Sequence, residues 1–529
     1  MAKKLLCILM AALMLLSVVA CADGSSAATE APTETSASAT EVESVGEGEN
    51  KGEDESENKG ESEGESEGES ESEGKVDGET DTNYTFDLAE KKFNCTLVFL
   101  TRDEDEWSTV EIIPEEDSEF VPISEAVNER NMIVESKYKI TIEELKEATG
   151  NHSTRVQNEV LSPTGEFQAV VTSLAQASNM LQSCNLADLL SDTCSPYLDF
   201  SKGYWDGNLA DSLKVEGHLF MATGDILTSD NDATFMMLFN KALITDVQLE
   251  SPYMLVDNKQ WTMSKMYDMM VAATNDKDGD GELMYDSDVS GLAYTNDVPY
   301  CIMYAGGLQI VNRDENGDFL LALDVNRASG VAEKANLIFS KDYTYNMNES
   351  GISVVETGQK CFGEGHALFF GECMQCVSRM RNYDVMFGIV PYPMYDEQQG
   401  QYYSMLHTTG GVVAIPCSVN GQQRADVAYM LEAIAYESVS TVTYLYYDLN
   451  LTSKNVTDEE SRPMIDLIMQ SRVYDPAYYL GIGGTVVSSL AGAMKPSNAG
   501  TVASISKSAE KQINRDVRNL KKKVAKYKD

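Results

Sequence analysis

Residues 216–243 constrain the fold of this chain most, because they join two apolar runs through a polar turn. The first run, residues 219–222, ends at Thr223-Gly224-Asp225, and a stretch rich in Asp, Ser, Asn and Thr follows. The second run, residues 235–239, leads into Asn240-Lys241 and a segment of helical character. A strand, a polar turn, a second strand and a helix are typical of a chain that leaves one α/β lobe and enters another. We therefore predict a hinge crossing here, with two lobes that face a cleft.

The amino terminus has the features of a secretory signal. Lys3 and Lys4 precede an apolar segment of residues 5–20, which is too short to span a bilayer comfortably and is followed at once by polar sequence. We predict a signal peptide over residues 1–20. Its end, Val18-Val19-Ala20-Cys21, resembles the lipobox of bacterial lipoproteins. Cys21 is then expected to carry the lipid that anchors the protein to the outer face of the cell membrane.

Residues 21–83 form an acidic, low-complexity stretch after this signal. Ser, Thr and Ala give way to repeats of Glu, Ser and Gly, and residues 23–81 hold 21 acidic and 3 basic residues. Without apolar residues no core can form, and like charges keep such a chain extended. We predict a disordered tether that holds a folded domain clear of the membrane or the cell wall. An inert solvated tail is the alternative.

The remaining chain is long enough for two or three domains and is strongly acidic. The net charge of the whole sequence is −45, and −35 remains when the signal, the tether and the basic tail of residues 507–529 are set aside. This charge argues against nucleic acid as a partner and is compatible with neutral ligands. The tail is expected either as a frayed helix that touches anionic lipid or wall polymer, or as a solvated end.

Eight cysteines remain besides Cys7 of the signal and Cys21. An even number in an exported chain permits disulfides, and Cys184 with Cys194 could close a local loop. The Cys373-Met-Gln-Cys376 motif has redox or metal-ligand spacing, but no second Cys or His pair accompanies it at zinc-finger spacing. Buried, unpaired thiols are the alternative.

Residues 93–171 alternate between strand and helix patterns. Residues 93–100, 138–143 and 167–171 have the character of strands, and helical segments lie between them. Such alternation favours a mostly parallel sheet. Because ligands bind beyond the carboxyl ends of the strands in such sheets, we look to the loop after the first strand, with Arg102 and Trp107.

Several stretches resemble, in their order and spacing, the bacterial extracellular solute-binding proteins of family 1 that serve carbohydrate ABC transporters. The stretches are LDFSKGYWDGN, EGHLFMATGD, MLFNKAL, QWTM with Thr262 as a helix N-cap, GEGHALFFGE, FGIVPYP and HTTGGVVAIPC. The resemblance covers nearly all of residues 92–500. It implies an α/β, type II periplasmic-binding-protein-like fold with two lobes, each a mostly parallel sheet flanked by helices. It also implies a carbohydrate ligand and an ABC transporter permease as partner, with the protein itself a monomer.

Two lobes with a hinge between them follow from this resemblance. Lobe one would comprise residues 84–236 and 405–442, and lobe two residues 237–404 and 443–506. The chain would cross the hinge three times. Such a hinge lets the lobes close on a ligand, and the closed form is favoured only by the extra contacts that the ligand makes there.

A sugar site needs aromatic faces against the ring and polar side chains for the hydroxyls, because an unmatched buried hydroxyl is costly. The residues that we expect to supply them are Arg102, Trp107, Asp225, Glu372 and His407, with Trp205, Tyr204 and Tyr304 as further aromatic candidates. For each of them a structural role is the alternative.

Residues 276–288 match the front half of an EF-hand loop. Acidic residues stand at positions one, three and five, a glycine at six and a backbone carbonyl at seven, namely Asp276, Asp278, Asp280, Gly281 and Glu282. Ser287 stands where the bidentate Glu of position twelve belongs, and Asp286 or Asp288 could replace it. We predict a structural Ca²⁺ site in lobe two, and no catalytic cofactor. An acidic surface turn is the alternative.

Three classes of function remain open at this point. The first is a tethered binding protein, not an enzyme, that hands a mono- or oligosaccharide to a transporter. The second is an exported glycoside hydrolase, with carboxylates such as Asp225 and Glu372 as acid and base, although the sequence contains no nucleophile elbow and no HExxH motif. The third is a surface adhesin or sensor with the same lobes. Turnover of oligosaccharides would favour the second class, and binding without closure the third.

Overall fold

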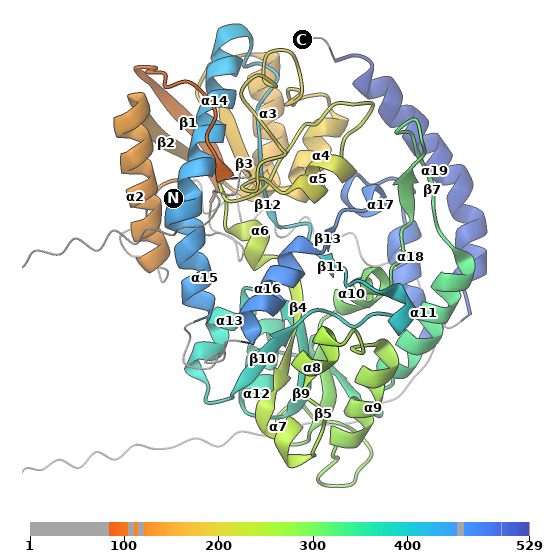
Figure 1. Cartoon of the computed structure of the whole chain (residues 1–529). Helices are drawn as coiled ribbons and strands as arrows, with labels where there is room; N and C mark the ends of the chain where they lie inside the picture. The colour runs from red at the N-terminus through yellow and green to blue at the C-terminus, as the bar shows by residue number, and fades with distance from the viewer. Residues whose placement is uncertain (1–83, 104–109, 115–120, 452–459, 499, 528–529) are drawn as a thin grey trace, which may run out of the picture. The chain divides into compact units, whose positions relative to one another are not determined.

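Two mixed sheets organise the part of the chain that the structure describes (Figure 1). This computed structural model describes residues 84–103, 110–114, 121–451, 460–498 and 500–527. They all belong to one unit, Gly78–Asp529. The predicted signal, Cys21, the predicted tether and Trp107 lie outside the described residues.

The first sheet has the strand order β12-β3-β1-β2. Its strands are β1 (Cys95–Arg102), β2 (Ile140–Glu147), β3 (Ala169–Ser173) and β12 (Gly411–Ala414). β1 pairs in parallel with β2 and with β3, whereas β12 runs antiparallel to β3. The helices that belong to this half are α2 (Val121–Tyr138), α3 (His152–Leu161), α4 (Leu174–Gln182) and α14 (Gly421–Ser438). Every residue of β3 and β12 is buried, as expected of short apolar runs without alternation.

The second sheet has the order β10-β4-β9-β5-β8. Its strands are β4 (Phe235–Asn240), β5 (Ser290–Tyr294), β8 (Thr344–Asn346), β9 (Ala367–Cys373) and β10 (Phe387–Val390). β5 is parallel to β8 and β9, and β4 is antiparallel to β9 and β10. The helices between these strands are α7 (Lys241–Asp246), α8 (Pro252–Asp257), α9 (Met263–Ala273), α10 (Val298–Ala305), α11 (Val325–Ile338), α12 (Val354–Gly363) and α13 (Cys376–Arg379).

Shorter strands and further helices complete the description. They are α5 (Gly207–Ser212), α6 (Ser229–Asp232), β6 (Val311–Arg313), β7 (Phe319–Leu321), β11 (Ser404–Met405), α15 (Tyr444–Leu451), α16 (Ser461–Gln470), β13 (Arg472–Val473), α17 (Pro476–Tyr479), α18 (Val486–Ala493) and α19 (Val502–Val524). Two helix starts show the caps that the sequence indicates. Asn240 accepts the Ala242 N–H at the start of α7, and Thr262 accepts the Lys265 N–H at the start of α9.

The chain passes between the two sheets three times. The first passage leads through α6 to β4, and the second returns through residues 405–411 to β12; an isolated bridge between Thr234 and Leu406 holds them side by side. The third passage follows α14 through the π-helix Val439–Thr443 into α15, after which α16 packs on β10. The predicted α/β fold class with a hinge crossed three times is confirmed.

One predicted strand is wrong. Residues 219–222 form one isolated bridge, between Ala222 and Val413, and no strand. The chain has to turn immediately after Ala222, because Gly224 adopts a φ of 151°, and a Cβ at that position would lie 2.2 Å from the Tyr204 carbonyl oxygen. Only glycine tolerates that turn.

The cysteines of the described residues are all free, so the possible Cys184–Cys194 disulfide is not formed. The Cys184 thiol donates to the Lys523 carbonyl oxygen at 3.8 Å, whereas Cys194 is buried in the core of the first sheet. Cys373 and Cys376 are both buried.

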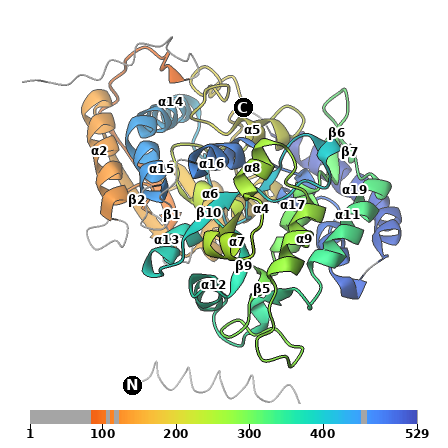
Figure 2. The same ribbon diagram turned by 60° about the horizontal axis from the view of Figure 1, so that its bottom comes forward.

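The carboxyl-terminal residues continue the folded unit. From residue 502 onward the chain forms α19, which packs on α11, α18 and β7, and Figure 2 shows it beside α11. The Tyr527 ring packs at a tilt of 43° against Phe220, with 4.5 Å between the ring centroids. Among the described residues, no helix combines the length and the apolar character that crossing a bilayer requires.

Candidate functional site

The carboxyl ends of strands from both sheets meet at the second passage, residues 405–411. From the first sheet, α4 begins directly after β3, and its Ala175 N–H donates to the Thr408 carbonyl at 3.0 Å. In the second sheet, β4 starts beside the carboxyl end of its antiparallel neighbour β9, where Phe235 pairs with Cys373, and the Phe235 ring lies 5.9 Å from the His407 ring. Because ligands of open α/β sheets bind beyond the carboxyl ends of strands, this junction is the first place to examine for a binding site.

Five side chains gather there, and we call them the His407 cluster: His407, Thr409, Asp297, Tyr300 and Tyr478. The His407 Nε2 lies 3.9 Å from Asp297 Oδ1, and its Nδ1 lies 2.7 Å from the Thr409 hydroxyl. The Tyr300 and Tyr478 rings are 5.8 Å apart, and all five side chains are partly exposed. An aromatic pair beside a histidine, a carboxylate and a hydroxyl is the combination that a sugar ring requires.

Arg102 and Glu372 lie at the carboxyl ends of β1 and β9. Arg102 is buried and donates through Nη2 to the Ser229 hydroxyl at 3.2 Å, while its Nε has no hydrogen-bond partner among the described residues. Glu372 accepts the Cys373 N–H at 2.9 Å, and burial raises the pKa of its carboxyl group. Of the predicted residues, Arg102, Glu372 and His407 thus lie at strand ends or at the junction.

Asp225 and Trp205 line a different space, a pocket of about 510 Å³ that we call the Trp205 pocket. Arg462, Asp466 and Arg472 are among its other lining residues, whereas Glu372 is not. Burial raises the pKa of the Asp225 carboxyl group to about 7. Since Asp225 and Glu372 do not share this pocket, it does not hold the predicted acid and base of a hydrolase together.

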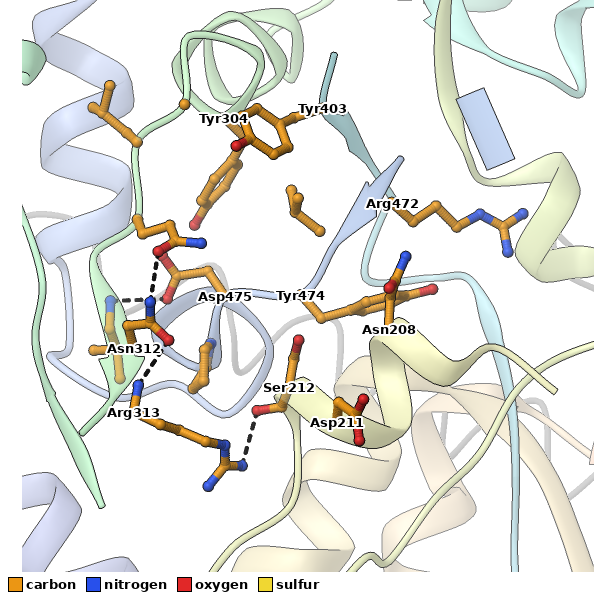
Figure 3. A pocket seen from close by; sticks show the side chains of 16 residues that line it. Asn208, Asp211, Ser212, Tyr304, Asn312, Arg313, Tyr403, Arg472, Tyr474 and Asp475 are labelled. Atoms are coloured by element: carbon orange, nitrogen blue, oxygen red, sulfur yellow. Dashed lines mark hydrogen bonds between the residues drawn. The ribbon is translucent and has the colours of Figure 1, made fainter. Parts of the chain in front are cut away.

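Tyr204 and Trp205 are held by one buried carboxylate. The Tyr204 hydroxyl and the Trp205 Nε1 each donate to Glu432 of α14 at 2.7 Å, and only 1% and 4% of the two residues are exposed. Burial raises the pKa of Glu432 to about 7. Both rings pack within the core of the first half, although Trp205 also lines the Trp205 pocket. Tyr304, the last aromatic candidate, lines another pocket of about 340 Å³ together with Tyr403, Tyr474 and Asp475 (Figure 3).

The predicted calcium loop brings together three of its five proposed ligands. Carboxylate oxygens of Asp276, Asp278 and Asp288 lie within 4.8 Å of one another, and Asp288 is buried. The Asp288 oxygens accept the Lys277 and Met284 N–H groups, which fixes the carboxylate toward the loop. Asp280 and Glu282 are exposed and do not join this group. Oxygen ligands of this kind suit Ca²⁺, so the residues present fit the ion.

Sequence reasoning missed Asp297, Tyr300 and Tyr478. Asp297 and Tyr300 follow β5 directly and begin α10, so the rule that points to the residues after the first strand could also have found them. Tyr478 has no such signal. It lies in α17, far along the chain, and only tertiary packing brings it to Tyr300.

The stability of the protein should fall as the pH rises, because the partly buried Asp232 of α6 lies near other carboxylates. Its Oδ1 accepts the Tyr446 hydroxyl at 2.8 Å, yet burial raises its pKa from 3.8 to about 7. The folded state therefore binds a proton that the unfolded chain has already lost, and the stability present at low pH is lost between about pH 4 and 7. We expect Asp232→Asn, which keeps the acceptor, to reduce the difference in unfolding free energy between acid and neutral pH by about 1–2 kcal/mol. Urea denaturation at several pH values measures the unfolding free energy of the wild type and of Asp232→Asn. An equal change of this free energy with pH in the two proteins would contradict the prediction.

No family model matches the chain, and no curated protein matches it. Solved structures do resemble it. An ABC substrate-binding protein from Listeria monocytogenes in complex with cycloalternan is 12% identical and has a TM-score of 0.51, covering 80% of this chain and 100% of that one. A sugar transporter from Rhizobium etli in an open conformation is 12% identical with a TM-score of 0.52, covering 82% and 100%.

A third structure, UspC from M. tuberculosis, is 14% identical with a TM-score of 0.50 and covers 79% of this chain and 100% of that one. At such identities the likeness concerns the fold. The two sheets and the three passages between them match these similar structures. The folded part of the chain therefore has the fold of the solute-binding proteins of ABC transporters.

Proposed function

We propose that this protein binds a carbohydrate between its two lobes and delivers it to an ABC transporter permease. The fold supports this proposal, because the similar structures include an ABC substrate-binding protein in complex with cycloalternan and a sugar transporter. The observation that carries it is the His407 cluster, where His407 lies 3.9 Å from Asp297 and the Tyr300–Tyr478 pair lies near the same carboxylate. Rings would stack on the sugar faces, and the polar groups would bind hydroxyls.

The lobes in this proposal are residues 84–236 with 405–442, and residues 237–404 with 443–506. Arg102 and α4 would contribute from lobe one, and Asp297, Tyr300 and Glu372 from lobe two. A ligand that contacts both sides favours the closed state by the difference between its contacts in the closed and open states. Binding without turnover is expected.

We also propose that the protein lies outside the cytoplasm, anchored to the outer face of the cell membrane. This placement depends on a lipid at Cys21 and on the acidic tether of residues 21–83, and the protein is expected to act as a monomer. Incorporation of a labelled fatty acid into the expressed protein tests the anchor.

A thermal-shift screen against neutral mono- and oligosaccharides tests the binding function. A ligand at 100 times its dissociation constant stabilises a protein by about 2.7 kcal/mol, which is readily detected. Stabilisation by at least one carbohydrate, with the carbohydrate recovered unchanged, is the expected result. If no carbohydrate stabilises the protein the proposal fails, and release of shorter sugars would favour a hydrolase instead.

We also propose that the loop of residues 276–288 binds a structural Ca²⁺ ion. The expected result is that Ca²⁺ raises the midpoint of thermal unfolding and that a chelator reverses the rise, since a ligand that binds only the folded state stabilises it. Asp288→Asn should abolish the response, because Asp288 closes the group with Asp276 and Asp278. Asp286→Asn is the matched control: Asp286 is exposed in the same loop and lies outside that group. Calorimetry with Ca²⁺ measures binding, and an unchanged response in Asp288→Asn would contradict the assignment.

A further inference from the structure

The carboxyl-terminal helix α19 presents a row of exposed basic side chains. We call this row the basic stripe, and its members are Lys507, Lys511, Arg515, Arg518 and Lys522. They recur every three or four residues, which places them on one face of the helix. At a rise of about 1.5 Å per residue, the stripe is about 22 Å long. Such a row of cations contrasts with a sequence whose net charge is −45.

The opposite face of α19 is the one that packs on the protein. The helix contacts α11, α18 and β7, and Figure 1 shows it at the outer edge of the folded part. Its buried residues are Val502, Ala509, Ile513, Val517, Leu520 and Val524. Each stripe residue stands two positions before a buried one, from Lys507 before Ala509 to Lys522 before Val524. Two positions turn an α-helix by about 200°, so the stripe points away from the core.

Most charges of the stripe are not neutralised by the protein itself. Among the described residues, only Arg515 of the stripe has an ion pair, with Asp516 at 3.6 Å. The neighbouring Lys521, by contrast, pairs with both Glu216 and Asp318. The stripe therefore keeps its positive charge available for an anionic partner.

An extended anionic surface suits this row better than a small anion does. The stripe lines neither the Trp205 pocket nor the pocket beside Tyr304, so neither pocket encloses an ion against it. Anionic lipid headgroups present their charge over a plane, and each Lys or Arg near such a surface strengthens binding about fivefold. The exposed Glu510 lies about 100° around the helix from Lys511, beside the stripe. Acidic residues elsewhere oppose the contact little, because charges more than about 8 Å away are largely screened at physiological salt.

We propose that the basic stripe of α19 binds the anionic headgroups of a lipid bilayer and lays the helix along the membrane surface. The choice of a membrane rests on the localisation proposed above: a protein anchored at Cys21 meets the bilayer at a high local concentration, where weak contacts suffice. The contact goes beyond carbohydrate binding, because it sets which side of the folded region faces the membrane. A phosphate-bearing polymer of the cell wall has similar charge, and the experiment distinguishes the two.

The test uses residues 22–529, which leave out the predicted signal peptide and Cys21 but keep the whole unit Gly78–Asp529. No lipid on the chain then contributes, so the result does not depend on the anchor. Co-sedimentation with vesicles of equimolar phosphatidylglycerol and phosphatidylcholine should show binding that high salt weakens, and vesicles of phosphatidylcholine alone should bind at least 10-fold more weakly. The triple variant Lys511→Glu, Arg518→Glu, Lys522→Glu should weaken binding to the anionic vesicles about 100-fold.

The triple variant Lys92→Glu, Lys139→Glu, Lys341→Glu is the matched control, because it changes the net charge equally at three exposed lysines outside α19. It should bind the anionic vesicles as the wild type does. Both triple variants should bind carbohydrate normally, so a failure here leaves the carbohydrate function standing. The proposal is overturned if the two kinds of vesicle bind equally, or if the two triple variants lose equal affinity. Binding to poly(glycerol phosphate) without binding to anionic vesicles also overturns it, in favour of a wall polymer.

Discussion

Arg472→Leu should lower the free energy of unfolding by about 3–5 kcal/mol, because it leaves buried carboxylates without their counter-charge. Arg472 is 5% exposed and donates to Asp230 at 2.9 Å, and Asp230 itself is 1% exposed. The same guanidinium reaches Asp206, which also accepts the Tyr474 hydroxyl at 2.6 Å. Removing the arginine breaks the contacts that connect β13 to Asp230 in α6 and to Asp206 at the start of α5.

Urea denaturation of the purified protein measures this loss. Lys360→Ala is the control, because the Lys360–Glu356 pair is a half-exposed i,i+4 pair on α12 and is worth about 0.5 kcal/mol or less. The double variant Arg472→Leu with Asp230→Leu should recover part of the stability, since replacing both partners by apolar groups removes the unpaired charge. A loss no larger than that of Lys360→Ala would show that this buried pair contributes nothing.

Much of the fold follows from local sequence patterns. The apolar run of residues 235–239 forms β4, the cap at Thr262 begins α9, and the FGIVPYP stretch contains β10. Such features depend on neighbours in the chain, so spacing and capping chemistry reveal them. The run of residues 219–222 has the same apolar character but meets β12 only at Ala222: β12 ends at Ala414, and the Leu219 carbonyl accepts the Leu189 N–H instead.

The residues of the candidate site could be predicted from local sequence patterns to a much smaller extent than the fold. The sequence pattern could indicate only that Arg102, Glu372 and His407 lie at strand ends or at a passage between the sheets, and the structure places them there; their role in binding stays a prediction. Tyr204 and Trp205 look like exposed aromatic plates beside a turn, yet Glu432, more than 200 residues later, binds both from α14. The sequence around residue 205 does not predict the contact with Glu432. In the same way, the sequence around Tyr478 does not predict its contact with Tyr300.

Tyr478→Ala should weaken carbohydrate binding at the His407 cluster by about 30-fold or more, as the loss of an aromatic anchor does at other interfaces. Tyr478 is partly exposed and its ring packs at a tilt against Tyr300, so the exposed part of the ring is available to a ligand. Tyr478→Phe keeps that face and should retain most of the affinity. Isothermal titration calorimetry with the carbohydrate found in the screen gives both values.

Tyr343→Ala is the matched control for this substitution. It removes a partly buried tyrosine from a comparable ring pair, with Tyr267, away from the His407 cluster. Its binding should equal that of the wild type, and a similar loss in both variants would mean that general destabilisation, not contact with the ligand, is responsible.

The comparison with His407→Ala then separates two kinds of site. Where stacking dominates, Tyr478→Ala loses more affinity than His407→Ala; where hydrogen bonds to hydroxyls dominate, the order is reversed, and the Tyr300–Tyr478 pair is packing rather than a platform for the sugar.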